Sequence, residues 1–202
     1  MKLFCAGLFF IMMQSNAVAQ QDAGYIKAIT AYQKKYVALH EVVKGKDKKF
    51  FRFFPADKNY LVKCSFEKLH DTAMVIMKTS GTKIPEKDFT RYGKIMFTIH
   101  DTALKLTVYQ SKSLQQNPQY KNYLFIPFTD ITTGDDTYGS GRYIDIATTD
   151  IKNNTVEIDF NKAYNPYCAY TTGYNCPIPP RENYLNVAIN AGEKTFAKPG
   201  GH

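Results

Sequence analysis

The 202-residue chain contains no tryptophan and only four cysteines. Tryptophan is the best stacking platform for sugar rings, so its absence weighs against a dedicated carbohydrate site. The cysteines are too few for a fold that depends on disulfides, and the chain is long enough to bury a core without them. The longest apolar run, Leu3 to Met13, has about 11 residues, whereas a membrane-spanning helix needs roughly 20.

Recognisable catalytic signatures are also missing. The chain has no nucleophile elbow, no metal-ligand pair at a known spacing, and no phosphate-binding loop followed by a helix. His70 and His100 are isolated in the sequence, so zinc is not favoured. We therefore expect no metal and no cofactor, and the sequence leaves open whether the protein is an enzyme.

The N-terminus has the pattern of a secretory signal peptide. Lys2 is followed by the apolar run, and Ala17 to Ala19 form a small-x-small cleavage site. The sequence therefore predicts a signal peptide over residues 1–19 and one exported domain over residues 20–202. It predicts a periplasmic or extracellular location, with no transmembrane segment after cleavage.

The formal net charge is +8, which raises the question of nucleic-acid binding. The lysines are nevertheless spread along the chain, and the densest run is Lys44 to Lys49. We expect no nucleic-acid partner. Long-range attraction to an anionic envelope surface remains compatible with this charge.

The chain has one helical pattern followed by many short strands. Ile29, Tyr32, Tyr36 and Leu39 recur at helical spacing, which predicts an amphipathic helix over residues 22–44, capped by Asp22 and ended by Gly45. About nine strands are predicted at residues 50–54, 60–66, 73–78, 95–99, 104–108, 123–128, 142–147, 155–160 and 184–189. These elements predict a mainly β fold, either an antiparallel β-sandwich or a partly open barrel with one N-terminal helix.

Several motifs occur in a fixed order in the C-terminal half. They are Phe128-Thr129-Asp130, Tyr138-Gly139-Ser140-Gly141-Arg142-Tyr143, Asp159-Phe160-Asn161, Tyr164-Asn165-Pro166-Tyr167-Cys168, Cys176-Pro177, Glu182-Asn183 and Ala191-Gly192-Glu193-Lys194. Over residues 128–194 the chain resembles a bacterial family of uncharacterised proteins, domain of unknown function 1684, with a looser match over residues 50–110. The resemblance implies an extended β-rich domain and no established activity.

Carboxylates in this region are candidates for chemistry. In the strand at 155–160, alternation places Asp159 opposite the apolar face, and in the strand at 142–147 it places Asp145 with Tyr143. If the two strands pair, both carboxylates share a polar face with Arg142 at its rim. Such a pair suits acid–base work or a hard cation. The candidate set is completed by Asn161, Glu182 and Asn183.

Tyrosine, proline and cysteine gather between residues 159 and 183. Tyrosine combines a flat apolar ring with a hydroxyl group, which suits a recognition surface. Cys168 and Cys176 are the natural disulfide in an oxidising compartment, which leaves Cys64 as a buried free thiol. The same residues are also compatible with a second small core.

Three functional hypotheses follow. The favoured one is a non-catalytic binding module for a small polar ligand, a glycan or an envelope protein. The alternatives are a hydrolase-like enzyme that uses Asp145, Asp159 or Glu182, and a purely structural motif block. The candidate surface comprises Tyr138, Arg142, Asp145, Asp159, Asn161, Tyr164, Asn165, Tyr170, Glu182 and Asn183.

Overall fold

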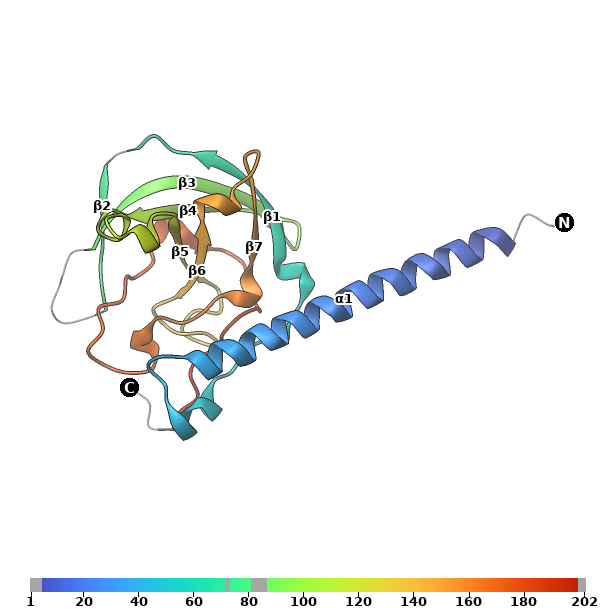
Figure 1. The fold of residues 1–202 in the computed structure, drawn as a ribbon, viewed down its shortest axis with the longest axis horizontal. Helices are drawn as coiled ribbons and strands as arrows, with labels where there is room; N and C mark the ends of the chain where they lie inside the picture. The colour runs from blue at the N-terminus through green and yellow to red at the C-terminus, as the bar shows by residue number, and fades with distance from the viewer. Residues whose placement is uncertain (1–4, 72, 81–86, 200–202) are drawn as a thin grey trace.

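The computed structural model describes residues 5–71, 73–80 and 87–199, which form a β domain with one long helix running past it (Figure 1). In chain order the helices and strands are α1 (Cys5–Leu39), β1 (Leu61–Lys68), β2 (Met74–Met77), β3 (Lys87–Ile99), β4 (Thr102–Ser111), α2 (Lys112–Gln115), β5 (Tyr123–Asp130), β6 (Arg142–Ala147), β7 (Thr155–Asp159) and β8 (Tyr184–Leu185). Short 3-10 turns connect several of these elements.

The strands form one curled sheet. Six of them are antiparallel neighbours in the order β6-β5-β4-β3-β1-β7, while β2 pairs with β3 and β8 lies parallel to β5. The right-handed twist of antiparallel strands favours such curling. β6 and β7 lie at the two ends of the order (Figure 1). The fold is therefore the partly open barrel, one of the two predicted architectures.

The hairpin of β3 and β4 is the longest pairing in the sheet. Ile99 pairs with Thr102, so the turn consists of His100 and Asp101, at φ angles of 47° and 60°. Two residues at positive φ are what a two-residue hairpin needs to match the twist of its strands. The alternation over residues 95–99 and 104–108 predicts this hairpin, with a turn at Asp101-Thr102. The hairpin is confirmed, its turn lies one residue earlier, and both strands are longer than predicted.

The barrel interior holds the main core. In β1 the side chains of Val62, Cys64 and Phe66 are buried and alternate with solvent-facing positions. Cys64 is a free, buried cysteine, as predicted. In β3 the backbone of Gly93 lies against Phe66, and a Cβ atom there would overlap that ring. A larger residue at position 93 would therefore force the ring out of the core.

β5 is buried on both faces, because a second apolar cluster covers the outside of the sheet. Leu124 and Ile126 face the main core, whereas Phe125 belongs to an outer cluster with Tyr109 and Tyr143. This explains why the strand is a continuous apolar run rather than an alternating one. The outer cluster forms the floor beneath the C-terminal motif segment.

The predicted helix at 22–44 differs from α1 at both ends. No proline interrupts the residues before Asp22, so the helix continues from Cys5 through that position. Asp22 forms an ion pair with Lys58 at 2.8 Å instead of starting the helix. After Leu39 the chain turns, and the Nδ1 atom of His40 accepts the backbone N–H of Val43.

The strand predicted at 50–54 is wrong. Residues Gly45–Phe50 form a 3-10 turn, and only Phe53 makes a single β-bridge, to Glu193. The aromatic residues that suggested alternation pack instead into a cluster with Tyr36 and Tyr170. Aromatic packing can produce the same sequence spacing as a strand.

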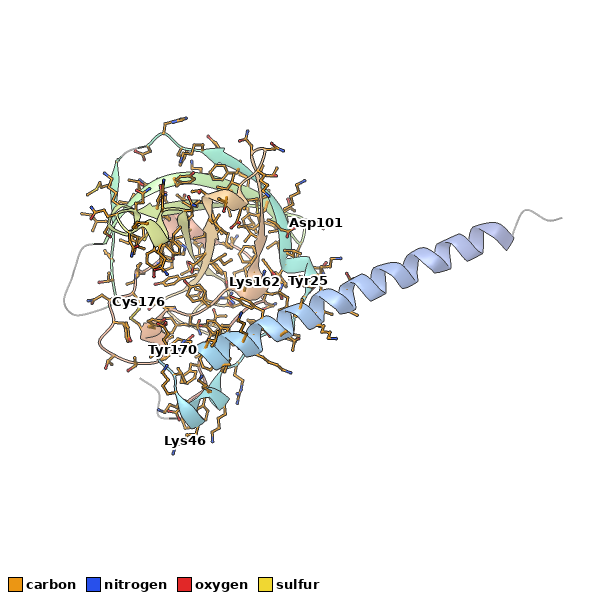
Figure 2. The ribbon with its side chains drawn as sticks, in the orientation of Figure 1. Tyr25, Lys46, Asp101, Lys162, Tyr170 and Cys176 are labelled. Carbon is orange, nitrogen blue, oxygen red and sulfur yellow. A yellow bond between two sulfur atoms is a disulfide. The ribbon has the colours of Figure 1, made fainter. Side chains whose placement is uncertain are left out.

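The C-terminal half of α1 lies against the side of the barrel between β6 and β7. Ile29 is buried, and the hydroxyl of Tyr25 donates to Asp159 at the end of β7. Figure 2 shows Tyr25 and Lys162 beside the middle of α1 and Tyr170 near its C-terminal end. In Figure 1 the N-terminal part of α1 extends away from the β domain.

Candidate functional site

A groove of about 940 Å³ lies between the C-terminal end of α1 and the segment 164–177. Cavities of this size hold small organic ligands. Its aromatic lining consists of six tyrosines and one histidine: Tyr32, Tyr36, Tyr143, Tyr164, Tyr167, Tyr174 and His40. We call this cavity the tyrosine groove.

Most of the groove's hydroxyl groups are already used as donors. Four of the six tyrosines donate to protein acceptors: Tyr36 to Glu193, Tyr143 to the carbonyl of Pro177, Tyr164 to Asp145, and Tyr167 to Glu41. A phenolic hydroxyl has one hydrogen, so these four oxygens can only accept a hydrogen bond from a ligand. The groove therefore offers ring surfaces and acceptors.

Asp145 is the carboxylate in the floor of the tyrosine groove. It projects from β6 between two tyrosines, with Oδ1 accepting from Tyr123 at 2.8 Å and Oδ2 from Tyr164 at 2.7 Å. Its side chain is reached by solvent through the groove, yet the surrounding protein displaces much of its water. This burial raises the pKa of Asp145, while the two hydroxyl donors act in the opposite direction.

The segment 164–177 is fixed to the sheet at its far end. The sulfur atoms of Cys168 and Cys176 lie at disulfide distance, with Cα atoms 6.2 Å apart, as the sequence predicted. The carbonyl of Cys176 accepts from the backbone N–H of Ser80 at 3.0 Å, and Ile178 donates to Lys78 at 2.7 Å. One wall of the groove is thereby anchored beyond the end of β2.

A second cleft of about 490 Å³ continues from the first between β6 and β7. Tyr32, Asp145 and Tyr164 line both cavities, and Asp159 lines the second. The condition under which Asp145 and Asp159 would share a polar face, pairing of their two strands, is not met, because the strands are at opposite ends of the sheet order. The curl of the sheet, rather than pairing, brings both carboxylates to one cleft.

Asp159 forms hydrogen bonds and an ion pair that hold parts of the fold together. Its Oδ1 atom accepts from Tyr25 at 2.8 Å and from the side chain of Asn161 at 3.0 Å, and its Oδ2 atom lies 3.6 Å from Lys162. Asn161 also bonds to the backbone N–H and carbonyl of Asp57. The two predicted candidates Asp159 and Asn161 thus join α1 to the barrel.

Glu193 is a buried carboxylate that was not among the candidate site residues predicted from the sequence. It is fully buried behind Tyr36, and it accepts from Tyr170 at 2.7 Å and from the backbone N–H of Asn165 at 3.0 Å. Burial raises the pKa of Glu193 to about 7, although these hydrogen bonds oppose the shift. Two of its partners, Tyr170 and Asn165, were in the predicted set and could have pointed to a buried acceptor.

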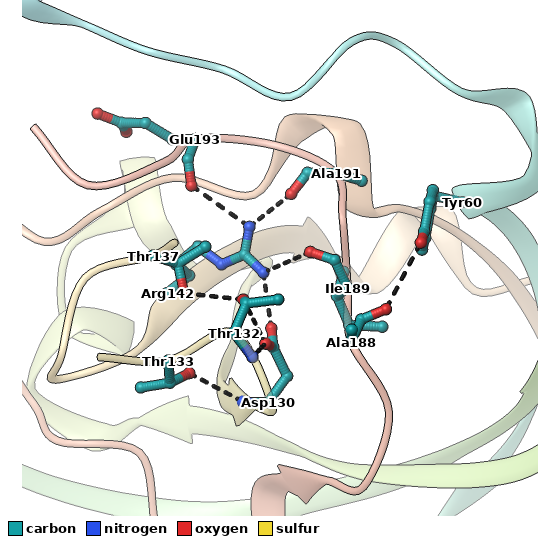
Figure 3. Close-up of polar contacts among 10 residues, drawn as sticks. All are labelled: Tyr60, Asp130, Thr132, Thr133, Thr137, Arg142, Ala188, Ile189, Ala191 and Glu193. Atoms are coloured by element: carbon teal, nitrogen blue, oxygen red, sulfur yellow. Dashed lines mark hydrogen bonds and ion pairs between the residues drawn. The ribbon is translucent and has the colours of Figure 1, made fainter. Parts of the chain in front are cut away.

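Arg142 lies in the interior and not at a rim, which corrects the prediction (Figure 3). Its guanidinium is 1% exposed, forms an ion pair with Asp130 at 2.6 Å, and donates to the backbone carbonyls of Ile189, Ala191 and Glu193. Five donors in a rigid fork suit this role. Arg142 therefore holds the C-terminal segment to the barrel and is closed to ligands.

The remaining candidates do not line the tyrosine groove. Asn183 is buried and bonds to the backbone of Thr107 and Pro127, at distances of 2.7–2.9 Å. Glu182 accepts from Arg91 at 2.9 Å and from Tyr109, so it does not join Asp145 and Asp159. Tyr138 is half-buried in the turn before β6 and is outside the groove lining.

The described part of the chain lacks both a metal-binding cluster and a membrane-spanning helix. Among residues 5–71, 73–80 and 87–199, His, Cys, Asp and Glu side chains form no group of three that would hold a metal ion. Within the same ranges, no helix combines the length and the apolar character needed to cross a membrane.

Comparison with known proteins gives a family but no activity. The family model described as "Protein of unknown function (DUF1684)" matches residues 48–194. The chain is similar to an uncharacterised protein of Haloarcula marismortui with a solution NMR structure: 23% identity, a TM-score of 0.60, and coverage of 94% of this chain and 96% of that one. This likeness shows the fold. No protein of curated function matches.

Proposed function

Because the chain belongs to the DUF1684 family, whose description states no activity, we propose a function from the groove itself: the protein is an exported binding module that holds a small ligand in the tyrosine groove. The observation that carries this proposal is the set of six tyrosine rings around one cavity. Such rings supply apolar contact area and lose little conformational entropy when a ligand binds.

The arrangement of the carboxylates supports binding over catalysis. A hydrolase-like site would bring at least two of Asp145, Asp159 and Glu182 within hydrogen-bonding reach of each other. Instead, Asp145 bonds to tyrosines, Asp159 to Tyr25 and Asn161, and Glu182 to Arg91. Of these three carboxylates, only Asp145 lines the tyrosine groove, where it can orient a ligand.

The size and chemistry of the groove favour a small molecule among the three partner classes. Its volume of about 940 Å³ matches a compact ligand, and aromatic rings are the largest class of side chains in its lining. A glycan carries many hydroxyl groups, so a site for it needs both hydrogen-bond donors and acceptors. In the tyrosine groove most phenolic hydrogens are already bonded to protein acceptors. An envelope protein would be expected to need a broader surface than this groove.

Export is part of the proposal. The signal-peptide pattern predicts cleavage after Ala19, upstream of Tyr25 and Ile29, where α1 is anchored to the barrel. Processing there would leave the groove wall intact. An oxidising compartment would also suit the close approach of Cys168 and Cys176.

The test is the native mass of protein purified from its own export compartment, compared with its denatured mass. We expect a denatured mass that corresponds to cleavage after Ala19 and a native mass that includes a bound small molecule. The variant Tyr174→Ala removes a ring that lines the groove, at a residue that is 42% exposed. Its matched control is Tyr120→Ala, at a site that is 38% exposed and outside the groove.

Loss of the bound mass in Tyr174→Ala and its retention in Tyr120→Ala would support the proposal. A wild-type native mass equal to the bare processed chain would contradict it. So would a bound mass that persists unchanged in Tyr174→Ala.

A further inference from the structure

The tyrosine groove presents acceptors and electron-rich rings rather than donors. Four of its six hydroxyl hydrogens bond to Glu193, Pro177, Asp145 and Glu41, so these four phenols have no hydrogen left to donate to a ligand. The faces of aromatic rings carry partial negative charge. A ligand that donates hydrogen bonds and carries positive charge is complementary to both features.

The charged residues of the groove point the same way. The lining has two carboxylates, Asp145 and Glu41, against one lysine, Lys35. His40 also lines it, and burial lowers the pKa of His40 to about 4, so this ring is neutral at pH 7. The charged side chains of the groove lining therefore sum to a net negative charge, whereas the whole chain has a formal net charge of +8.

Asp145 has room for a further partner. A carboxylate has about four acceptor positions, and the hydroxyls of Tyr123 and Tyr164 occupy one on each oxygen. The side chain of Asp145 is accessible through the groove, and among the described residues it forms no ion pair, although Lys152 and Lys162 line the adjoining cleft. An ammonium group beside it would complete the hydrogen bonding and neutralise the charge.

We propose that the ligand of the tyrosine groove is an organic cation, a protonated amine on an apolar or aromatic body. The inference rests on the proposed binding function and specifies its ligand class. The ammonium group would bond to Asp145, and the apolar body would lie among the rings of Tyr36, Tyr167 and Tyr174. The ring of Tyr32 already lies near a cation of the protein itself, because the Nζ atom of Lys162 is 5.7 Å from its ring centroid.

The experiment compares three probes of the same shape and different charge: phenethylamine, phenethyl alcohol and hydrocinnamate. Each is titrated at neutral pH into the processed protein, and amide resonances of the groove residues Leu39, Gly173 and Asn175 report binding. We expect phenethylamine to bind about tenfold or more tightly than the alcohol, as a charge-assisted hydrogen bond and cation–π contacts predict. Hydrocinnamate should bind most weakly.

Two variants test the role of Asp145. Asp145→Asn keeps the shape of the side chain and removes its charge, so the amine and the alcohol should bind within about twofold of each other. Asp135→Asn removes the same charge from an exposed turn outside the groove and should keep the wild-type ratio. A thermal melt of each variant verifies folding.

The outcomes separate this inference from the function it rests on. If the alcohol or hydrocinnamate binds as tightly as the amine, or if the preference for the amine survives in Asp145→Asn, the groove binds ligands but not as a cation site. If no probe shifts the groove resonances up to about 10 mM, a range that covers fragment-sized ligands, the cation inference is overturned. The native mass then decides independently whether the groove holds a ligand of another kind.

Discussion

Asp130 and Arg142 form an ion pair inside the barrel, where neither side chain is more than 1% exposed. Removing one partner of a buried pair leaves the other charge without compensation, which costs about 3–5 kcal/mol. We therefore expect Asp130→Ala to lower the free energy of unfolding by about that amount in urea denaturation. Lys58→Ala, which removes the exposed pair with Asp22, should cost about 1 kcal/mol or less.

A loss in Asp130→Ala no larger than that in Lys58→Ala would show that Arg142 finds other compensation. Among the described residues, the hydrogen-bond acceptors of Arg142 other than Asp130 are the backbone carbonyls of Ile189, Ala191 and Glu193. The comparison of the two variants decides between these cases.

Individual site residues were predictable where strand alternation controls them. Asp145 and Tyr143 were placed on one face of the strand at 142–147, and both line the groove. Arg142 was misplaced because arginine is usually exposed, and its ion pair depends on a distant segment. Glu193 was missed because a single glutamate near the C-terminus shows no local sign of full burial.

α1 contributes to the fold through its C-terminal half. Its described contacts include the buried Ile29 and the bond from Tyr25 to Asp159. Deletion of residues 1–19 should change the free energy of unfolding by less than about 0.5 kcal/mol. Deletion of residues 1–31 should cost about 3–4 kcal/mol, from the burial of one isoleucine and a hydrogen bond to a carboxylate.

Thermal or urea denaturation of the two truncated proteins measures this difference. Equal stability of both would mean that α1 does not close the gap between β6 and β7. A large loss from the shorter deletion would place stabilising contacts before residue 20.

The strands were predictable to different degrees for physical reasons. The hairpin of β3 and β4 has local alternation and a short turn, and its existence followed from the sequence. The prediction failed at 50–54, where aromatic residues pack against α1 rather than joining a ladder. Sheet order depends on contacts between distant segments, which one sequence does not reveal.

Two buried groups, Glu193 and His40, contribute opposite effects to the pH dependence of the whole protein. Glu193 has a folded pKa of about 7 against an ordinary value of 4.5, so its folded form holds a proton more strongly, and stability is lost as the pH rises through this window. His40 has a folded pKa of about 4 against 6.5, so stability is lost as the pH falls through that window.

In the wild-type protein these effects oppose each other between about pH 4.5 and pH 6.5. Glu193→Gln should remove the first, so its free energy of unfolding, relative to the wild type, should rise by about 3 kcal/mol between pH 4.5 and pH 7. Urea denaturation at several pH values measures the difference. A constant difference across this range would mean that Glu193 does not change its proton affinity on folding.

The walls of the tyrosine groove come from opposite ends of the chain. Tyr36 meets Glu193 across 157 positions, and Tyr25 meets Asp159 across 134. Such contacts have high loop-closure entropy and form late in folding, after the local hairpins. During synthesis, the helix wall emerges long before the segment that completes the cavity. A polypeptide released or cleaved before residue 193 would therefore have a sheet but no finished groove, and ligand binding would report on complete chains alone.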